Sequence, residues 1–367
     1  VTDEVAPGLA EVGLVTSALW SDYDNDGDPD LIVAGEWMPL TFFRNDGGRF
    51  TNATATTGLG DTRGWWNSLA AGDFDHDGDV DYVAGNRGLN SRFKASPDRP
   101  FRVYAADFDQ NGSFDPILFH YIGDKSYPVA WRDALIDQII AMKGRFPRYI
   151  DYARATVERT LSEKERRSAY VAEVVTFASS YVENLGGGRF AIRPLPIRAQ
   201  AAPIFGMQVG DYDGDGWLDV LIVGNSYATE TQAGWYDALT GGILRGDGKG
   251  RFEYIDGNRS GFFVDGDAKA IAEVLIDEGR SLILATQNSD SVKVFARAVG
   301  SESVRRLRVE PLDAYAVITL SDGRIRRQDL TYGSTYLSQS SRYLEVPANA
   351  VEVVIYDCQG SGRTIRF

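Results

Sequence analysis

The chain has very little cysteine and histidine. Cys358 is the one cysteine among 367 residues, and His76 and His120 are the two histidines. A single cysteine excludes an internal disulfide framework and a cysteine-based zinc cluster. Two histidines leave little room for histidine-ligated metals and argue against general-base chemistry near neutral pH. The motifs G-x-S-x-G, H-E-x-x-H and the P-loop are missing too. An enzyme is therefore the less favoured class, and the sequence leaves it open.

Long apolar runs and long basic runs are also missing. No stretch approaches the length of a membrane-spanning helix, and no basic n-region followed by an apolar segment is visible near the first residues. The formal net charge is −14, and no basic run reaches five residues. These features argue against nucleic acid or an anionic membrane as the main partner. The hydrophobic content of 43% is ordinary for a folded soluble protein.

A nine-residue acidic motif occurs four times. It reads DYDNDGDPD at 22–30, DFDHDGDVD at 73–81, DFDQNGSFD at 107–115 and DYDGDGWLD at 211–219. Each copy precedes a short apolar run such as LIVAG or VLIVG, which is typical of a strand, an acidic turn and a second strand. Glycine-rich turns that end at Phe50, Phe190 and Phe252 indicate tight connections between two outer strands. Units of about 50 residues with about four strands each predict propeller blades.

The predicted fold is all-β, with a β-propeller of about five blades over residues 1–299 and a small β module at 300–367. Helical periodicity, seen in Leu135, Ile136, Ile139 and Ile140, predicts a helical insertion in the third blade at 131–170. The insertion is either a packed decoration or a lid or partner-binding face.

The ring is expected to close through the first residues. Residues 1–9 resemble 50–59, which reads as the outermost strand of a blade. Residues 268–297 look like three strands of a blade, with a decayed acidic turn near Asp277 and no obvious fourth strand. We therefore expect the N-terminal strand to complete this last blade. The alternative is an excerpt of a longer, seven-bladed ring.

The acidic motifs predict calcium sites. Alternate residues point to one side of a tight loop, and a cage of hard oxygens suits Ca²⁺ better than Mg²⁺, which prefers few carboxylates and several waters. Side-chain oxygens are expected from positions 1, 3, 5 and 9, and a backbone carbonyl from position 7. The predicted ligands are Asp22, Asp24, Asp26, Asp28, Asp30, Asp73, Asp75, Asp77, Asp79, Asp81, Asp107, Asp109, Asn111, Ser113, Asp115, Asp211, Asp213, Asp215, Trp217 and Asp219. We expect about four structural calcium ions, the weakest in the third loop, where Asn111 replaces an aspartate.

An EF-hand is excluded by position counting. That motif needs a glutamate at loop position 12 and flanking helices. Position 12 of the four motifs holds Val33, Ala84, Leu118 and Ile222. None of these side chains can bind a metal, and all four lie in apparent strands.

The four acidic motifs with their strands resemble FG-GAP/VCBS repeats, the calcium-binding blades of integrin-type propellers and of many bacterial surface proteins. The tail segment GSTYLSQSSRYLEV resembles the core of ASPIC/UnbV domains, which follow such repeats in cartilage-acidic-protein-like proteins. The tail departs from that pattern after Leu344. The resemblance implies a calcium-bound propeller, and it is weak for function because these propellers serve adhesion, carbohydrate binding and enzyme scaffolding.

Polar and aromatic residues follow the second strands of the repeats. Equivalent positions on successive blades fall around one ring, so these side chains are expected to line a central funnel or to wedge between blades. The candidates are Glu36, Trp37, Trp65, Trp66, Asn67, Asn86, Arg87, Asn225, Tyr227, Trp235, Tyr236 and Asp237. They favour a non-enzymatic binding or adhesion protein outside a bacterial cell or on its surface, with a glycan or protein ligand. The alternative is a polysaccharide hydrolase or lyase that uses Asp237 in the funnel.

Overall fold

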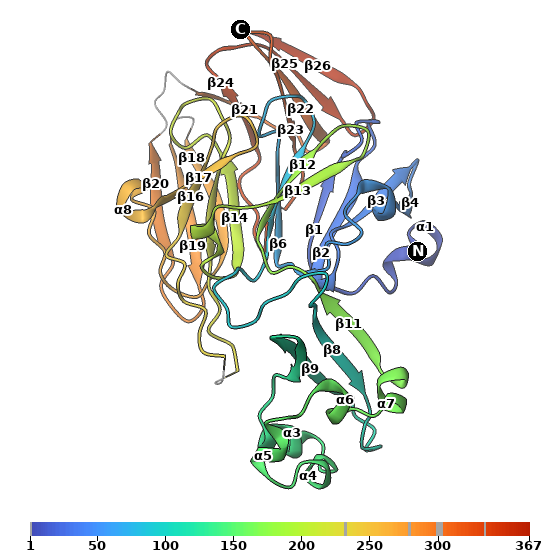
Figure 1. Cartoon of the computed structure of the whole chain (residues 1–367). Helices are drawn as coiled ribbons and strands as arrows, with labels where there is room; N and C mark the ends of the chain where they lie inside the picture. The colour runs from blue at the N-terminus through green and yellow to red at the C-terminus, as the bar shows by residue number, and fades with distance from the viewer. Residues whose placement is uncertain (1, 231–232, 278–279, 299–303, 334) are drawn as a thin grey trace.

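The computed structural model describes residues 2–230, 233–277, 280–298, 304–333 and 335–367 (Figure 1). It confirms the all-β, propeller-type fold class, because antiparallel sheets of blade size follow one another along the chain. No helix in the described part of the chain is long and apolar enough to cross a membrane. The predicted domain boundary at residues 299–300 lies outside the described residues.

Within the described residues, four sheets form the propeller part, compared with the about five blades predicted, and we name them blades 1 to 4. Blade 1 contains β1 (Leu14–Ser21), β2 (Asp30–Met38), β3 (Thr41–Asp46) and β4 (Arg49–Asn52), and β5 (Gly64–Trp65) pairs with β2. Blade 2 contains β6 (Ser68–Gly72), β7 (Asp81–Gly85), β12 (Ser180–Asn184) and β13 (Phe190–Pro194). Blade 3 contains β14 (Ile204–Gly210), β15 (Asp219–Gly224), β16 (Gly242–Gly246) and β17 (Phe252–Asp256). Blade 4 contains β18 (Ala268–Asp277), β19 (Arg280–Gln287) and β20 (Lys293–Ala298).

The first strands of the blades lie next to one another in the order β1, β6, β14, β18. The apolar runs after the acidic loops form the second strands, and β7 and β15 are buried at every position because neighbouring blades cover both faces. Two large core clusters fill the interfaces, one between blades 1 and 2 around Trp66 and one between blades 2 and 3 around Met207. These two clusters therefore hold blades 1, 2 and 3 together.

A short helix or helical turn follows the outer strand of each four-stranded blade. These are α2 (Thr54–Thr57), η2 (Ile197–Gln200) and α8 (Gly257–Ser260). The first residues form α1 (Thr2–Val5) and η1 (Pro7–Leu9), which contact β4 of blade 1. The similarity between 1–9 and 50–59 therefore reflects this connecting helix. The prediction that an N-terminal strand completes blade 4 is wrong, and the turn between β18 and β19 lies outside the described residues.

Blade 2 is interrupted by a large insertion between β7 and β12. The insertion contains a sheet of β8 (Phe101–Ala106), β9 (Asp115–Ile122), β10 (Lys125–Pro128) and β11 (Tyr170–Val174). Its helices are α3 (Arg132–Gln138), α4 (Met142–Arg145), α5 (Tyr149–Tyr152), α6 (Val157–Thr160) and α7 (Glu163–Ser168). Figure 1 shows this part below the blades. The sequence predicted that the third acidic motif belongs to a third blade of the ring, and this prediction is wrong because the motif lies in the inserted sheet. Ile140, one of the apolar residues of the predicted helical pattern, is exposed.

The last aspartates of the first and second acidic loops make equivalent hydrogen bonds to an outer hairpin. Asp30 accepts a hydrogen bond from the Asn45 amide in the β3–β4 hairpin of its own blade. Asp81 accepts the equivalent bond from Asn184, which lies 103 residues away. The outer hairpin after the insertion therefore completes blade 2, because its Asn184 amide donates to the carboxylate at the start of β7.

The C-terminal residues form two sheets around a separate core. One contains β23 (Ile325–Asp329), β22 (Asp313–Leu320), β25 (Ala350–Asp357) and β26 (Gly362–Arg366), and the other pairs β21 (Val304–Arg308) with β24 (Tyr343–Pro347). We call these sheets the C-terminal module. Figure 1 shows them at the end of the propeller opposite the insertion. Cys358 is exposed and has no disulfide.

Candidate functional site

The four acidic loops share one backbone arrangement. In the first loop, the Asp22 carboxylate accepts hydrogen bonds from the amides of Asp26 and Gly27, and Asp26 accepts one from the Asp28 amide. The second and third loops repeat this pattern, and the fourth keeps the bonds to its sixth and seventh residues. Glycine at position 6 has a positive φ in every loop, for example 97° at Gly27. The sharp turn directs several carboxylates toward one point.

Each loop brings three carboxylates together with oxygens within 4.8 Å of one another. The four clusters are Asp22, Asp24 and Asp30; Asp73, Asp75 and Asp77; Asp107, Asp109 and Asp115; and Asp211, Asp213 and Asp219. Asp24 Oδ1 and Asp75 Oδ1 are buried and have no hydrogen-bond partner in the described part of the chain. Buried carboxylate oxygens without a donor fit a cation, so these loops can hold a metal ion with hard oxygen ligands.

Burial raises the pKa of several carboxyl groups in these loops and so disfavours their charged forms when no cation is bound. It raises the pKa of Asp30 and of Asp219 to about 7, and that of Asp81 to about 8. Neighbouring carboxylates add to the effect, as Asp77 does for Asp75, whose pKa burial raises to about 6. A divalent cation would offset this repulsion and favour the charged forms.

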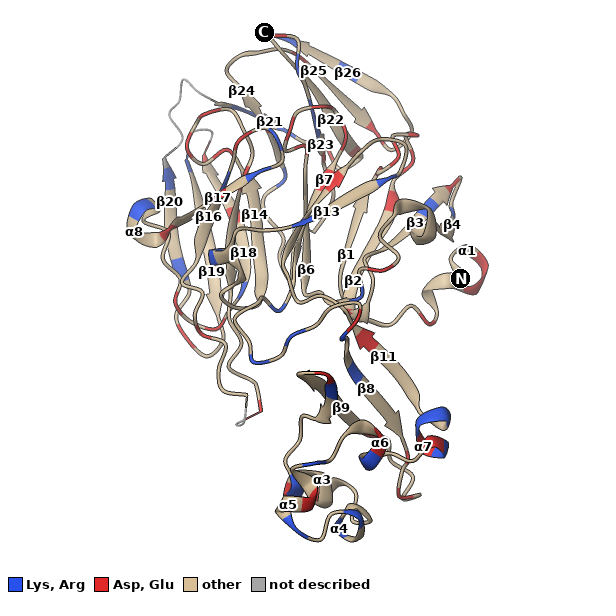
Figure 2. Ribbon diagram, viewed as in Figure 1, with Lys and Arg blue, Asp and Glu red and all other residues tan. Residues whose placement is uncertain are grey.

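The C-terminal module lies directly on the first, second and fourth acidic loops. Arg327 donates to Asp22 Oδ2 at 2.7 Å through its guanidinium and to Asp73 Oδ2 at 2.8 Å through its backbone amide. The guanidinium of Arg324 lies 4.2 Å from the Trp217 ring centre, and that ring contacts His76 at 4.6 Å. Figure 2 shows acidic residues where these blades meet the C-terminal sheets. The three loops and the module form one interface.

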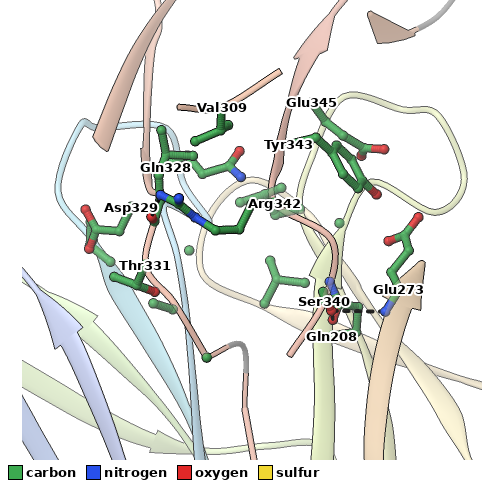
Figure 3. Close-up of a pocket in the computed structure, with 18 of the residues that line it drawn as sticks. Gln208, Glu273, Val309, Gln328, Asp329, Thr331, Ser340, Arg342, Tyr343 and Glu345 are labelled. Carbon is green, nitrogen blue, oxygen red and sulfur yellow. Dashed lines mark hydrogen bonds between the residues drawn. The ribbon is translucent and has the colours of Figure 1, made fainter. Parts of the chain in front are cut away.

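The module also sends a segment along the inner strands. The Ser340 hydroxyl accepts a hydrogen bond from the Glu273 amide at 3.0 Å and contacts Gln208 Oε1 at 2.9 Å (Figure 3). The Ser341 amide donates to the Glu273 carbonyl, and the Tyr336 ring lies 5.2 Å from that of Phe205. We call residues 335–342 the axial segment. It occupies the inner edges of blades 3 and 4, where the sequence predicted an open funnel, and leaves a cavity of about 180 Å³ beneath the module.

A larger pocket of about 570 Å³ lies at the other end of the blades from the three module-contacting loops. Its wall combines the ends of blades 1 to 3, the inserted sheet with α3, and Tyr336 of the axial segment. Five of the predicted ligand residues line it, namely Glu36, Trp65, Asn67, Arg87 and Tyr236. Burial raises the pKa of Glu36, and the Trp65 hydrogen bond and the Arg87 charge act in the opposite direction.

The other predicted ligand residues do not line this pocket. Trp66 is fully buried between blades and donates to the Thr62 carbonyl. The buried amides of Asn86 and Asn225 hold backbone groups next to the second strands. Trp37 stacks on Phe101 at 5.6 Å and so anchors the insertion. Trp235 stacks on Tyr227 at 4.8 Å on the surface. Asp237 is also exposed.

Several pocket residues escaped the sequence prediction. Phe93, Ile117 and Leu135 come from the insertion, and Tyr336 comes from the C-terminal part of the chain. Their spacing carries no repeat signal, because they reach the pocket through long-range packing. Phe205 also lines the pocket, and it precedes the fourth acidic motif by six residues. Its fixed distance from the motif could have identified it as a candidate.

A substitution in the third acidic loop, which lies in the insertion, should affect thermal stability less than a substitution in a loop that contacts the module. We expect Asp109→Asn to remove one bound calcium ion and to leave the melting temperature of the blades nearly unchanged, because no contact joins this loop to the module among the described residues. Asp24→Asn should also remove one ion but lower the melting temperature, since its loop contacts Arg327. Loss of the site in the first loop costs about 2.7 kcal/mol when free calcium is 100 times the dissociation constant. Calcium content and thermal melting of both variants check this, and equal melting shifts would contradict it.

Comparisons with known proteins identify the repeats. The chain matches the FG-GAP-like repeat family over residues 22–84 and the FG-GAP repeat family over residues 206–236. A search of curated proteins gives no match. Among solved structures, it is similar to BBS1N in its complex with ARL6DN, with 8% identity, 97% of this chain and 92% of that chain covered, and a TM-score of 0.21. It is also similar to the V. cholerae biofilm matrix protein Bap1, with 12% identity, coverage of 96% and 72%, and a TM-score of 0.17. Two parts of the chain therefore match FG-GAP repeats, and these parts hold its first, second and fourth acidic loops within a propeller-type fold.

Proposed function

We propose that this chain is a non-enzymatic, calcium-stabilised binding module that acts outside the cell or on its surface. The calcium ions occupy the four acidic loops, and each is held by the clustered carboxylates of its loop together with the predicted backbone carbonyl. The C-terminal module, which we infer to be of the ASPIC/UnbV type, then covers three of these loops. Calcium in this scheme is structural, and ligand recognition occurs elsewhere.

The observation that carries the binding function is the pocket between the blades and the insertion. Its volume of about 570 Å³ lies within the usual range of ligand sites. Aromatic rings and a small number of polar groups line it, a combination that suits the faces and hydroxyls of sugar rings. A glycan is therefore the ligand we propose, and a protein segment is the alternative that the test must separate.

Two tryptophans provide a matched test of this site. Trp65 lines the pocket, whereas Trp235 stacks on Tyr227 outside it. On a glycan array with the calcium-loaded chain, we expect Trp65→Ala to weaken binding about tenfold, because it removes an aromatic contact surface. Trp235→Ala should bind as the parent chain does. Loss of binding in Trp235→Ala alone would place the ligand on the surface instead, and an array without any bound glycan would refute the proposal.

A further inference from the structure

Arg87 lies in the pocket without a carboxylate partner. Its guanidinium is 4.6 Å from the Trp65 ring centre and 4.7 Å from that of Tyr236, and it donates to the Tyr236 hydroxyl at 2.6 Å. Within the described residues, no acidic group lies within ion-pair distance of Arg87, and its Nε is buried with no acceptor. The rings hold the guanidinium in place and leave part of its hydrogen-bonding capacity unused.

Asn67 supplies a second unused donor in the same pocket. Its side chain is 4% exposed, and its Nδ2 has no hydrogen-bond partner in the described part of the chain. A buried donor without an acceptor is costly, so an acceptor-bearing ligand gains by satisfying it. Asn67 directly precedes β6, and Arg87 follows shortly after the end of β7. These two strands are paired in blade 2, so the same sheet positions both groups.

Glu36 adds the opposite kind of group. It lines the pocket from the end of β2, where burial favours its neutral form and the nearby Arg87 favours its charged form. Its carboxyl oxygens accept hydrogen bonds from hydroxyl groups. The pocket wall thus combines two arginines, two carboxyl groups and two amides with several aromatic faces, namely Arg87, Arg92, Glu36, Glu230, Asn67 and Gln138 beside the rings. Arg87 and Asn67 are the two of these groups that have a buried nitrogen without an acceptor in the described part of the chain.

We propose that this pocket binds a hexuronic acid residue of an acidic polysaccharide. The sugar carboxylate pairs with Arg87 and accepts from Asn67, the hydroxyls donate to Glu36, and the ring packs on the aromatic wall. A neutral sugar would leave the Arg87 charge unpaired, and a simple inorganic anion would leave the aromatic wall empty. This inference rests on the proposed function, because it names the ligand class of the same pocket.

Calorimetry with short oligosaccharides tests the inference. The probes are trigalacturonate and its methyl ester, which keeps the shape and removes the charge. The calcium-loaded chain is first freed of excess calcium, because free calcium binds uronate oligomers. We expect trigalacturonate to bind and the ester to bind at least tenfold more weakly. Arg87→Met should weaken trigalacturonate binding about 10- to 100-fold, as expected for a charge-assisted contact.

Control variants keep the result interpretable. Arg87→Lys retains the charge and should recover part of the affinity, and thermal melting of each variant shows whether it folds. Arg44→Met removes an exposed arginine of the β3–β4 hairpin and should bind trigalacturonate normally. Equal binding of the acid and its ester, unchanged in Arg87→Met, would overturn the uronate assignment and leave a glycan site. Binding of an acidic peptide but of neither saccharide would overturn it as well. If neither saccharide nor any array glycan binds, the proposed function itself fails.

Discussion

Removal of calcium should bring this protein close to unfolding at ordinary temperatures. Each occupied loop beneath the C-terminal module stabilises the native state by about 2.7 kcal/mol when free calcium is 100 times the dissociation constant, so the three loops together contribute roughly 8 kcal/mol. That is comparable to the whole unfolding free energy of a typical domain. We therefore expect EDTA to lower the melting temperature strongly and added calcium to restore it, as measured by circular dichroism or calorimetry.

Magnesium is the matched control for this experiment. It prefers octahedral coordination with several waters, whereas each loop crowds three carboxylates within 4.8 Å. Magnesium at the same concentration should therefore restore much less stability than calcium. A melting temperature that EDTA leaves unchanged would show that the acidic loops are held by their backbone hydrogen bonds alone.

The second large effect is expected at the charge cluster between blade 4 and the C-terminal module. Arg297 pairs with Glu273 at 3.1 Å and with Glu345 at 2.9 Å, and its side chain is 6% exposed. It also donates to the Asp211 carbonyl at 2.7 Å, which ties the cluster to the fourth acidic loop. Arg297→Met removes the nearer guanidinium from buried Glu273 and partly buried Glu345, which keep Arg306 at 3.8 and 3.3 Å. We expect it to lower the unfolding free energy by about 3 to 5 kcal/mol, as measured by urea denaturation in the presence of calcium.

Two further variants separate charge burial from packing at this cluster. Arg297→Lys keeps the charge and should recover only part of the loss, because lysine cannot reproduce the forked contact with Glu345. Arg44→Met breaks an exposed ion pair with Asp46 and should leave the denaturation midpoint unchanged. A midpoint for Arg297→Met that matches the Arg44→Met variant would contradict the structural role of this cluster.

The repeat units were predictable from sequence because their signals are local. The acidic motif, the glycine at its sixth position and the following apolar run all lie within about fifteen residues. Val33, Ala84, Leu118 and Ile222 do lie in strands β2, β7, β9 and β15, as the exclusion of an EF-hand required. The turns that end in Arg-Phe do join outer strands in blades 1, 2 and 3.

The arrangement of the units was less predictable because it depends on distant pairing. Nothing near the third acidic motif indicates that the β12–β13 hairpin pairs with β7, nearly 100 residues earlier, rather than with β9. The clue is a hydrogen bond, from the Asn184 amide to Asp81, that sequence spacing does not reveal. Likewise, residues 2–9 repeat the connecting helix after a blade, but a single helical turn is too short to show periodicity.

The candidate ligand site was predicted only in part, because some of its residues reach it through pairing between distant parts of the chain. Glu36, Trp65, Asn67, Arg87 and Tyr236 follow from the rule that strand ends of successive blades meet. The rule predicted a central funnel along the first strands of the blades. The axial segment lies against these strands, and its residue Tyr336 forms part of the pocket wall. Trp66 and Asn225 have the same residue types as binding groups, and only their burial shows that they support the blades.

A crystal of the calcium-loaded chain, measured at a wavelength where calcium scatters anomalously, tests the central claim most directly. The account predicts four anomalous peaks, one inside each cluster of carboxylates at 22–30, 73–81, 107–115 and 211–219, with the weakest in the loop that contains Asn111. Density maps that show ordered loops without any anomalous peak would contradict it.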